Sequence, residues 1–280
     1  MNFTDTSRRA GMLAVIAILL AGALHAACVK APITGRRQLA IIPSSQLLAM
    51  SDTEYDSFLK QHKPLTSGSD AAMVREVGGR IQKAVEDYMG RKDLGDRLDG
   101  YEWEFNLVEG KEVNAWCMPG GKVVVYTGLL PITRTETGLA VVMGHEIAHA
   151  VAEHGRERMS QGLLAQLGGV ALDTAMSSKP AQTRALWGQA YGLGAQFGAL
   201  LPFSRLQESE ADHLGLIFMA IAGYDPSEAI PFWERMAESK KGAAPPEFLS
   251  THPSDQTRIE NLKELLPEAM KKYKKAAPAA

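Results

Sequence analysis

Cysteine and net charge are both scarce in this chain. Only two of its 280 residues are cysteines, so a framework of disulfide bonds does not hold the fold together. The formal net charge of -2 provides no basic field for a nucleic-acid backbone, and we therefore expect no nucleic-acid partner. With 45% hydrophobic and 22% charged residues, the chain can bury one sizeable core, which predicts one main domain with short extensions.

The apolar run at the N-terminus is too short to cross a membrane. Arg8 and Arg9 precede an uncharged, largely apolar run from Ala10 to Leu24. Its length is about fifteen residues, whereas a spanning helix needs roughly 20. A membrane anchor is therefore disfavoured, and residues 1–27 are predicted to be an export signal.

Cys28 follows the small residues Ala26 and Ala27 and resembles the acceptor cysteine of a bacterial lipoprotein signal. On this interpretation Cys28 is lipidated and tethers an exported, periplasmic protein to the outer membrane. His25 stands where that pattern usually has leucine, so conventional cleavage near Ala26 or Ala27 remains an alternative. If Cys28 is lipidated, Cys117 is left as a lone thiol, which we expect to be buried and inert.

Helical periodicity dominates the rest of the sequence. A turn-rich arm is predicted to end in a helix that starts at Ser44. Apolar spacing then predicts helices at residues 71–89, from 137 to 201 with an interruption at Pro202, and at 255–266. The Gly- and Ala-rich part, residues 162–201, is interpreted as a packed helical hairpin, with a mobile lid or a membrane-contacting pair as alternatives.

Two short segments carry strand signals. Residues 101–109 alternate apolar and acidic side chains, and residues 122–126 form a β-branched run after the turn residues 119–121. A small antiparallel sheet is expected, and the fold class is α+β and predominantly helical. The predicted divisions are the signal (1–27), an arm and helix (28–69), the main domain (70–267) and a basic, flexible tail (268–280).

The clearest chemical motif is His145-Glu146-Ile147-Ala148-His149. Two imidazoles four residues apart lie on one face of a helix and can share a metal ion, and Glu146 can then act as a base. The apolar residues around the motif predict a buried helix, in which Gly144 lets another backbone approach closely. Structural zinc sites are usually cysteine-rich and closed, so this pattern favours a catalytic zinc site, with one Zn²⁺ per chain.

A third ligand must come from elsewhere in the chain. The metzincin pattern needs glycine at position 152 and histidine at 155, but Ala152 and Gly155 stand there. His154 is one residue too early to serve as that ligand. We interpret His154 as a surface residue or a hydrogen-bonding neighbour of the site.

Glu208 is the better candidate for the third ligand. Ser204 and Gln207 resemble a capping box, which predicts a helix start that places Glu208 and Asp212 on one face, four residues apart. Asp212 is then expected to orient a ligating imidazole, and Glu210 to point elsewhere. A solvated acidic face would be the default interpretation without the histidine motif.

These residues resemble the CAAX-prenyl-endopeptidase and HtpX-type zinc metallopeptidases, a gluzincin family. The two motifs are His145 to His149 and Glu208 to Asp212, and the similarity covers roughly residues 70–265. It extends to residues 113–116, 119–121, 125–130 and 250–253. The Cys28 leader with Thr34-Gly35-Arg36 points to the soluble lipoprotein branch and to the mitochondrial Oma-type proteases. The membrane spans of other branches are missing, which argues against prenylated substrates.

The resemblance implies a zincin-type peptidase domain whose sheet packs on the active-site helix. It also implies that His252 faces the metal, where it stabilises the oxyanion or fills the open zinc position in a latent state. The alternative is that His252 is a loop residue on the surface with no role in the site. Asn114, Ala115 and Trp116 are expected to form an edge strand that aligns the substrate by β-augmentation.

The expected function is zinc-dependent hydrolysis of peptide bonds in unfolded or misfolded envelope proteins, including outer-membrane proteins. Glu146 would take the proton of the attacking water and return it to the leaving amine. The expected partners are unfolded polypeptides, a membrane reached through the lipid on Cys28, and the envelope assembly machinery. The alternative is a chaperone-like assembly factor with little proteolysis. A third interpretation is a zinc hydrolase that acts on non-peptide bonds, but the sequence shows no motif for a dedicated substrate pocket.

Overall fold

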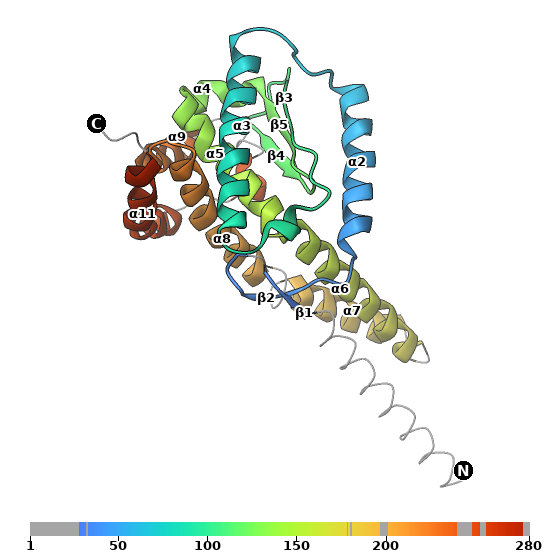
Figure 1. The fold of residues 1–280 in the computed structure, drawn as a ribbon. Helices are drawn as coiled ribbons and strands as arrows, with labels where there is room; N and C mark the ends of the chain where they lie inside the picture. The colour runs from blue at the N-terminus through green and yellow to red at the C-terminus, as the bar shows by residue number, and fades with distance from the viewer. Residues whose placement is uncertain are drawn as a thin grey trace, which may run out of the picture.

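A computed structural model describes residues 28–31, 33–177, 179, 181–196, 201–239, 248–252 and 256–276. The predicted signal over residues 1–27 and Pro253 lie outside the described residues. Figure 1 shows a mostly helical body with a small sheet on one side. The fold class is α+β and predominantly helical, as the sequence predicted.

Helices make up most of the body. They are α2 (Ser44–Gln61), α3 (Ser69–Gly90), α4 (Leu130–Thr133), α5 (Glu136–Val151), α6 (His154–Met176), α7 (Ala181–Ala195), α8 (Leu201–Ile221), α9 (Ala229–Ser239), α10 (Phe248–Thr251) and α11 (Gln256–Ala276). Short 3-10 helices lie at Gly95–Leu98, Thr127–Leu129 and Pro226–Glu228. The strands are β1 (Cys28–Lys30), β2 (Arg37–Leu39), β3 (Glu104–Val108), β4 (Ala115–Met118) and β5 (Lys122–Tyr126).

The main sheet has the strand order β3-β5-β4 and is mixed, so the expectation of an antiparallel sheet was wrong for one pair. β4 and β5 form an antiparallel hairpin, with Ala115 opposite Val125. β5 then lies next to β3 and runs parallel to it, with Phe105 opposite Val123. The chain reverses twice between β3 and β5, so those two strands share a direction. Within the described part of the chain, β4 is an edge strand.

Helix α5 lies at the centre of the core. Every residue from Gly138 to Val151 is buried, and the helix packs against α3, α8 and β4. Its start is capped by Thr135, whose Oγ1 accepts a hydrogen bond of 3.0 Å from the Gly138 N–H. It ends where Glu153 adopts a left-handed conformation (φ 59°), and α6 begins at the next residue. This break lets His154 turn back toward α5.

α5 and α8 approach each other at two glycines. A Cβ added at Gly144 would lie 3.0 Å from the carbonyl oxygen of Gly215, and one added at Gly215 would lie 2.9 Å from the His145 backbone nitrogen. Neither position has room for a side chain. The close crossing expected at Gly144 is therefore present, and it brings the histidine motif next to the acidic helix.

Helix α8 begins three residues before the predicted start. It runs from Leu201, with Pro202 in its first turn, where proline is tolerated. The predicted capping box of Ser204 and Gln207 is therefore wrong: the Gln207 amide instead donates a 2.7 Å hydrogen bond to Glu157 on α6. The Gln207 side chain makes this contact with α6 in place of the predicted cap at the start of α8.

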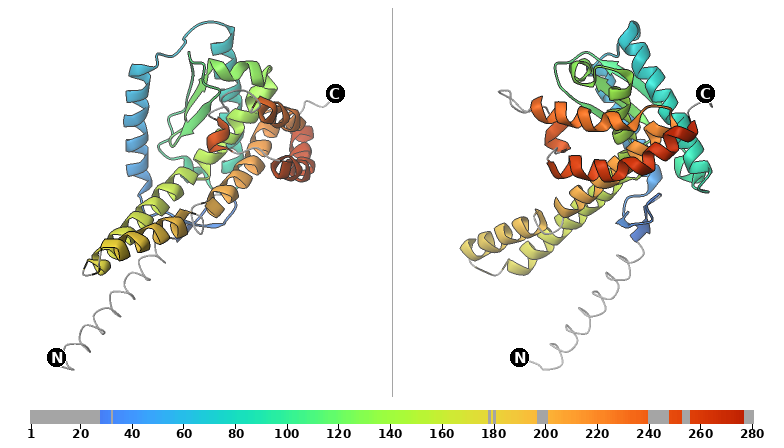
Figure 2. Two further views of the ribbon diagram at one scale, coloured as in Figure 1. Left: turned by 180° about the vertical axis from the view of Figure 1, so that it is seen from behind. Right: turned by 90° about the vertical axis from the view of Figure 1, so that its left-hand side faces the viewer.

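α6 and α7 form a helical hairpin that projects from the body (Figure 2). The Tyr191 hydroxyl on α7 donates to the Ala165 carbonyl on α6 at 2.9 Å. Several apolar side chains of the hairpin are exposed, including Leu167, Val170, Leu186 and Trp187. None of the described helices has the length and apolar character needed to span a bilayer.

Helix α11 extends beyond its predicted end at residue 266. It continues through Pro267 to Ala276, and the side chain of Ala269 is buried. Residues 268–276, which were predicted to be part of a flexible tail, are therefore helical and packed at least at Ala269. The many lysines of this segment suggested a solvated tail, but the apolar residues on one face of the helix pack against the body.

Candidate metal centre and active site

The two motif histidines converge from one face of α5. Their Nε2 atoms lie 3.1 Å apart, and both side chains are buried. This closeness follows from the four-residue spacing, since residues i and i+4 lie one helical turn apart on the same face. The helix that carries them is buried over its length, so it holds both rings in place.

Glu208 reaches the same point from α8. One carboxylate oxygen lies 3.3 Å from His145 Nε2, and the other lies 3.2 Å from His149 Nε2. His252 approaches from the opposite side, and its Nδ1 is 3.1 Å from His145 Nε2 and 3.0 Å from both Glu208 oxygens. Each of these four residues offers one ligand atom, and the four atoms all lie within 4.8 Å of one another.

These separations fit a zinc ion. Zinc bonds to histidine nitrogen and carboxylate oxygen measure about 2.0–2.2 Å, which places the corners of a tetrahedron about 3.3–3.6 Å apart. The contacts of His145 and Glu208 within the group measure 3.0–3.3 Å, and all four donor atoms lie within 4.8 Å of one another. The nitrogen and carboxylate donor set is also one that zinc prefers, so the residues present fit the metal.

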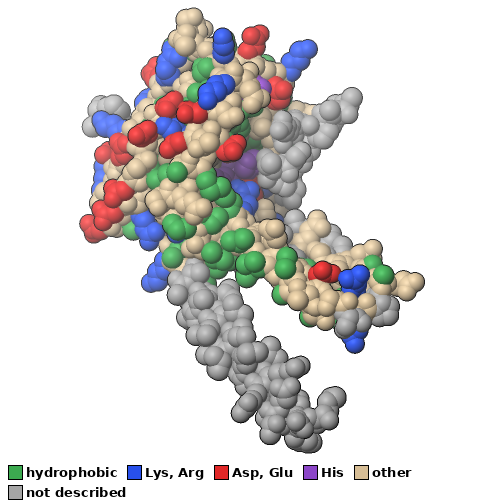
Figure 3. Space-filling view, turned by 90° about the vertical axis from the view of Figure 1, so that its right-hand side faces the viewer, with side chains coloured by type: hydrophobic (Ala, Val, Ile, Leu, Met, Phe, Trp, Pro, Cys, Tyr) green, Lys and Arg blue, Asp and Glu red, His purple; other side chains and the backbone are tan. Residues whose placement is uncertain are grey.

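Glu146 lies beside this cluster and faces a pocket. The pocket has a volume of about 290 Å³ and is lined by Glu146, His149, His252 and the β4 segment. On the face shown in Figure 3, a histidine is visible inside a recess. Among the described residues, Glu146 Oε1 makes no hydrogen bond, and it lies 3.4 Å from His252 Nε2. One carboxylate oxygen therefore remains for a proton in the pocket.

Asp212 contacts His145 on the side away from the cluster. Its Oδ1 lies 3.0 Å from His145 Nδ1, which leaves Nε2 to face the other donors. Arg258 on α11, which the sequence reasoning missed, donates to both Asp212 oxygens at 2.6 and 2.8 Å. Its Nη1 also lies 3.4 Å from a Glu208 oxygen, and its guanidinium carbon lies 3.4 Å from the centre of the Trp233 ring.

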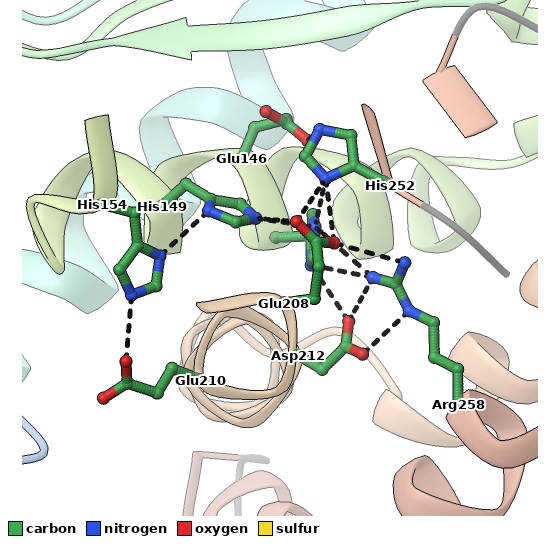
Figure 4. A network of polar contacts seen from close by, with 9 residues as sticks. Glu146, His149, His154, Glu208, Glu210, Asp212, His252 and Arg258 are labelled. Atoms are coloured by element: carbon green, nitrogen blue, oxygen red, sulfur yellow. Dashed lines mark hydrogen bonds and ion pairs between the residues drawn. The ribbon is translucent and has the colours of Figure 1, made fainter. Parts of the chain in front are cut away.

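A second imidazole contact supports His149. Its Nδ1 lies 2.9 Å from Nδ1 of His154, whose Nε2 is 3.2 Å from Glu210 (Figure 4). His154 is fully buried, so it is not a surface residue. Glu210 does point away from the cluster, as expected, but it is buried and accepts hydrogen bonds from Thr34 and Arg36 of the N-terminal arm.

Comparison with known proteins agrees with this geometry. The family model for peptidase family M48 matches residues 77–266, well over half of the chain. The chain belongs to peptidase family M48. The matched range contains the histidine motif, Glu208 and His252, and the zinc dependence of this family agrees with the donor set.

Curated M48 relatives include mitochondrial and bacterial proteases. The mitochondrial metalloendopeptidase OMA1 of Saccharomyces cerevisiae is 32% identical over 255 residues, 88% of this chain and 71% of that protein. OMA1 of Schizosaccharomyces pombe is 39% identical over 199 residues, 69% of this chain and 53% of that protein. The beta-barrel assembly-enhancing protease of Escherichia coli is 31% identical over 165 residues, 56% of this chain. The chain spans a third of that last protein's length.

Burial and neighbouring charges set the protonation of the donor groups in the M48 site. Burial lowers the pKa of His149 well below its ordinary value, which keeps that ring neutral. Burial also acts to lower the pKa of His145, but Asp212 and Glu208 outweigh it and raise the pKa to about 9. Burial acts to raise the pKa of Glu208, yet its histidine contacts lower it, so the carboxylate is charged. Zinc would displace the proton that His145 holds.

Burial raises the pKa of the Glu146 carboxyl, although the nearby His252 and His145 act in the opposite direction. A carboxyl with a raised pKa accepts a proton more readily than an ordinary glutamate. The position of Glu146 in the pocket and the direction of its pKa both suit a general base.

The wall of the pocket is formed by the predicted substrate strand. Asn114, Ala115 and Trp116 all line it, together with Cys117. The Trp116 ring packs edge-on against Phe58 of α2, with ring centroids 4.9 Å apart, so its side chain is partly committed to the core. Cys117 is half-buried, and burial raises the pKa of its thiol well above the ordinary value. Cys28, the predicted lipidation site, begins β1.

Proposed function

We propose that this chain is a zinc-dependent endopeptidase that cleaves unfolded or misfolded polypeptides of the cell envelope. One arrangement carries the proposal: His145, His149 and Glu208 converge at zinc-binding distances, next to Glu146 and the edge strand β4 in a single pocket. Three protein ligands with a nearby carboxylate base are typical of catalytic zinc sites.

The groups that the chemistry requires lie together in this pocket. When bound, zinc would lower the pKa of water to about 7 and polarise the scissile carbonyl. The Glu146 carboxylate accepts the proton of the attacking water and delivers it to the leaving nitrogen. Asp212 and Arg258 hold the His145 ring in orientation during these steps.

β4 supplies the means of holding a substrate. Among the residues that the structure describes, β4 pairs with β5 alone, so its other edge can offer backbone groups to an extended peptide. Recognition through the backbone reads few side chains, which suits polypeptides that have lost their fold. Folded proteins would not present an extended segment to this edge.

His252 keeps the site closed in the arrangement described here. Its Nδ1 occupies the place of a fourth donor, and a zinc site with four protein ligands has no position for water or substrate. We therefore propose that His252 is a ligand in the resting state and withdraws before catalysis. The His252 residue would then control when the protease is active.

The cellular setting follows from the N-terminus and the relatives. We propose export, lipidation at Cys28 and attachment to the outer membrane, with the envelope assembly machinery as a partner. The bacterial relative named beta-barrel assembly-enhancing protease supports this setting, and the mitochondrial OMA1 relatives support proteolysis in a compartment bounded by membranes. Palmitate labelling that depends on Cys28 supports the anchor, whereas labelling that persists in Cys28→Ser refutes it.

A chaperone-like assembly factor is the second candidate function. The closed donor set favours it, since a site that His252 keeps closed can hold client strands at β4 without cutting them. The two functions differ in whether the base at position 146 is needed in cells. A Glu146→Gln variant that fully complements a deletion would favour the binding role.

Glu146→Gln tests the proposed protease directly. The variant should retain zinc and lose cleavage of an unfolded protein such as reduced casein, because the amide cannot accept a proton. Glu136→Gln, the same change in the exposed first turn of the same helix, should cleave normally. Unchanged turnover by Glu146→Gln would reject the mechanism.

His252→Ala tests the closed state. This variant should bind zinc through its three remaining ligands and cleave casein faster than wild type, because a position for water is open. Cleavage slower than wild type, with zinc retained, would show that His252 takes part in the reaction instead of blocking it.

A further inference from the structure

A buried line of polar contacts connects the N-terminal arm with the metal centre. It runs from His149 Nδ1 to His154 Nδ1 at 2.9 Å, and from His154 Nε2 to Glu210 Oε2 at 3.2 Å. Arg36 Nε then donates to the same Glu210 oxygen at 2.7 Å, and the Thr34 hydroxyl donates to the other. Four separate segments, the arm, α5, α6 and α8, each contribute at least one member, and Figure 4 shows His149, His154 and Glu210.

The direction of each hydrogen bond follows from zinc binding at His149 Nε2. A neutral imidazole carries one proton, so His149 must hold its proton on Nδ1 and donate it to His154 Nδ1. His154 must then carry its own proton on Nε2, from which it donates to Glu210. Glu210 can only accept, and Arg36 and Thr34 keep it in place as a charged acceptor.

We infer that His154 and Glu210 are positioning residues for zinc: together they fix the tautomer and the ring orientation of His149, and Arg36 of the arm secures Glu210. A carboxylate that orients a ligating imidazole is a common arrangement, and here a second imidazole extends its reach. The segment that follows Cys28 is thereby part of the metal centre. This inference rests on the proposed zinc site.

Glu157 provides a matched control for this inference. It is also buried and also binds Arg36, with Nη1 and Nη2 contacts of 2.8 and 2.6 Å. Within the described part of the chain, its other side-chain contact is with the Gln207 amide, and neither contact leads to His154. Removing the Glu157 charge therefore weakens the docking of the arm and leaves the path from Glu210 to His149 intact.

The experiment measures zinc affinity of the full chain by competition with a chromophoric chelator. Glu210→Gln should weaken zinc binding by about 10–100-fold, the usual effect of losing a partner that orients a ligand. Glu157→Gln should stay within about threefold of wild type, since Glu157 contacts none of His149, His154 and Glu210, and Arg36 keeps its contact with Glu210. Equal losses in the two variants would show that arm docking alone matters and would overturn the inference.

A second pair of variants works even if Glu210→Gln fails to fold. His154→Phe removes both hydrogen bonds, and its zinc affinity should fall by about 10–100-fold. In His154→Gln the amide can accept from His149 and donate to Glu210, so it should restore most of the affinity. Wild-type affinity in His154→Phe would overturn the inference.

The tautomer supplies a readout that a purely structural role would not change. In the ¹⁵N spectrum of the zinc-loaded protein, His154 should be protonated on Nε2 and His149 on Nδ1. A His154 protonated on Nδ1 would contradict the assigned direction. If the wild-type chain binds no zinc at all, the proposed function itself fails, and that outcome is distinct from zinc binding that is indifferent to Glu210.

Discussion

Replacing Gly215 by alanine should damage the metal centre through the backbone alone. Gly215 lies on α8 where that helix crosses α5, and an added Cβ would stand 2.9 Å from the His145 nitrogen and 3.1 Å from the His145 Cα. Comfortable contacts to carbon lie at about 3.5–4.0 Å, so the helices must separate by about 0.5–1 Å. Both atoms belong to the backbone of His145, a proposed zinc ligand.

Two effects of this substitution oppose each other. Overpacking a well-filled core costs about 1–3 kcal/mol, and alanine in a helix stabilises by about 0.5–1 kcal/mol over glycine. The steric cost wins, and we expect a net destabilisation of about 1–2 kcal/mol. Zinc sites tolerate deviations of only about 0.2 Å, so zinc affinity should fall as well, by about tenfold or more.

Gly79→Ala is the matched control. Gly79 lies within α3, and a Cβ there would meet nothing within 4 Å. This variant should gain about 0.5–1 kcal/mol and keep its zinc affinity. Urea unfolding of the chelator-treated proteins measures the stabilities, and chelator competition measures the affinities. If Gly215→Ala is as stable as Gly79→Ala and binds zinc like wild type, the close crossing of α5 and α8 is refuted.

Three further predictions follow from the pocket and its surroundings. Cys117 in a Cys28→Ser background should be alkylated at pH 8 far more slowly in the native than in the unfolded protein, because burial raises its pKa; equal rates would disprove this. Extended peptides N-methylated at successive positions should bind the Glu146→Gln variant in an alternating pattern, because only every second amide faces a strand edge; a uniform loss would exclude strand pairing. Arg258→Met should destabilise the protein by about 3 kcal/mol in urea unfolding, because Asp212 and Glu208 lose a buried partner; a loss under about 1 kcal/mol would contradict this role.

Local patterns were enough to predict the central helix and which of its side chains meet. The apolar residues around the histidine motif predicted a buried α5, and the four-residue spacing predicted that His145 and His149 share a face. The same spacing on the acidic helix predicted that Glu208 and Asp212 point together, and both contact His145. These predictions succeeded where a single helical period determines which side chains meet.

Non-local contacts explain what the sequence could not predict. The parallel pairing of β3 with β5 depends on which strand lies between the other two, and no local signal specifies that order. His154, Glu210 and Arg36 meet because a helix break at Glu153 and the N-terminal arm come together in space. The sequence hinted at this contact only through His154, the third histidine within ten residues.

Arg258 was missed although a signal existed. It precedes Ile259 and Leu262, both buried, so it lies on or beside the apolar face of α11. A cation there needs a buried anion, and the acidic helix carries three carboxylates, Glu208, Glu210 and Asp212. Comparing the charges on the apolar faces of separate helices would have pointed to a contact between Arg258 and this acidic helix.

The account depends most on one zinc ion held by His145, His149 and Glu208. Metal analysis after dialysis against a mild chelator tests this directly, in the wild type, in Glu208→Gln and in Glu264→Gln on the exposed face of α11. We predict about one zinc per chain in the wild type and in Glu264→Gln, and less than about a tenth of that in Glu208→Gln, since each ligand is essential to such a site. Full zinc occupancy in Glu208→Gln would contradict the account.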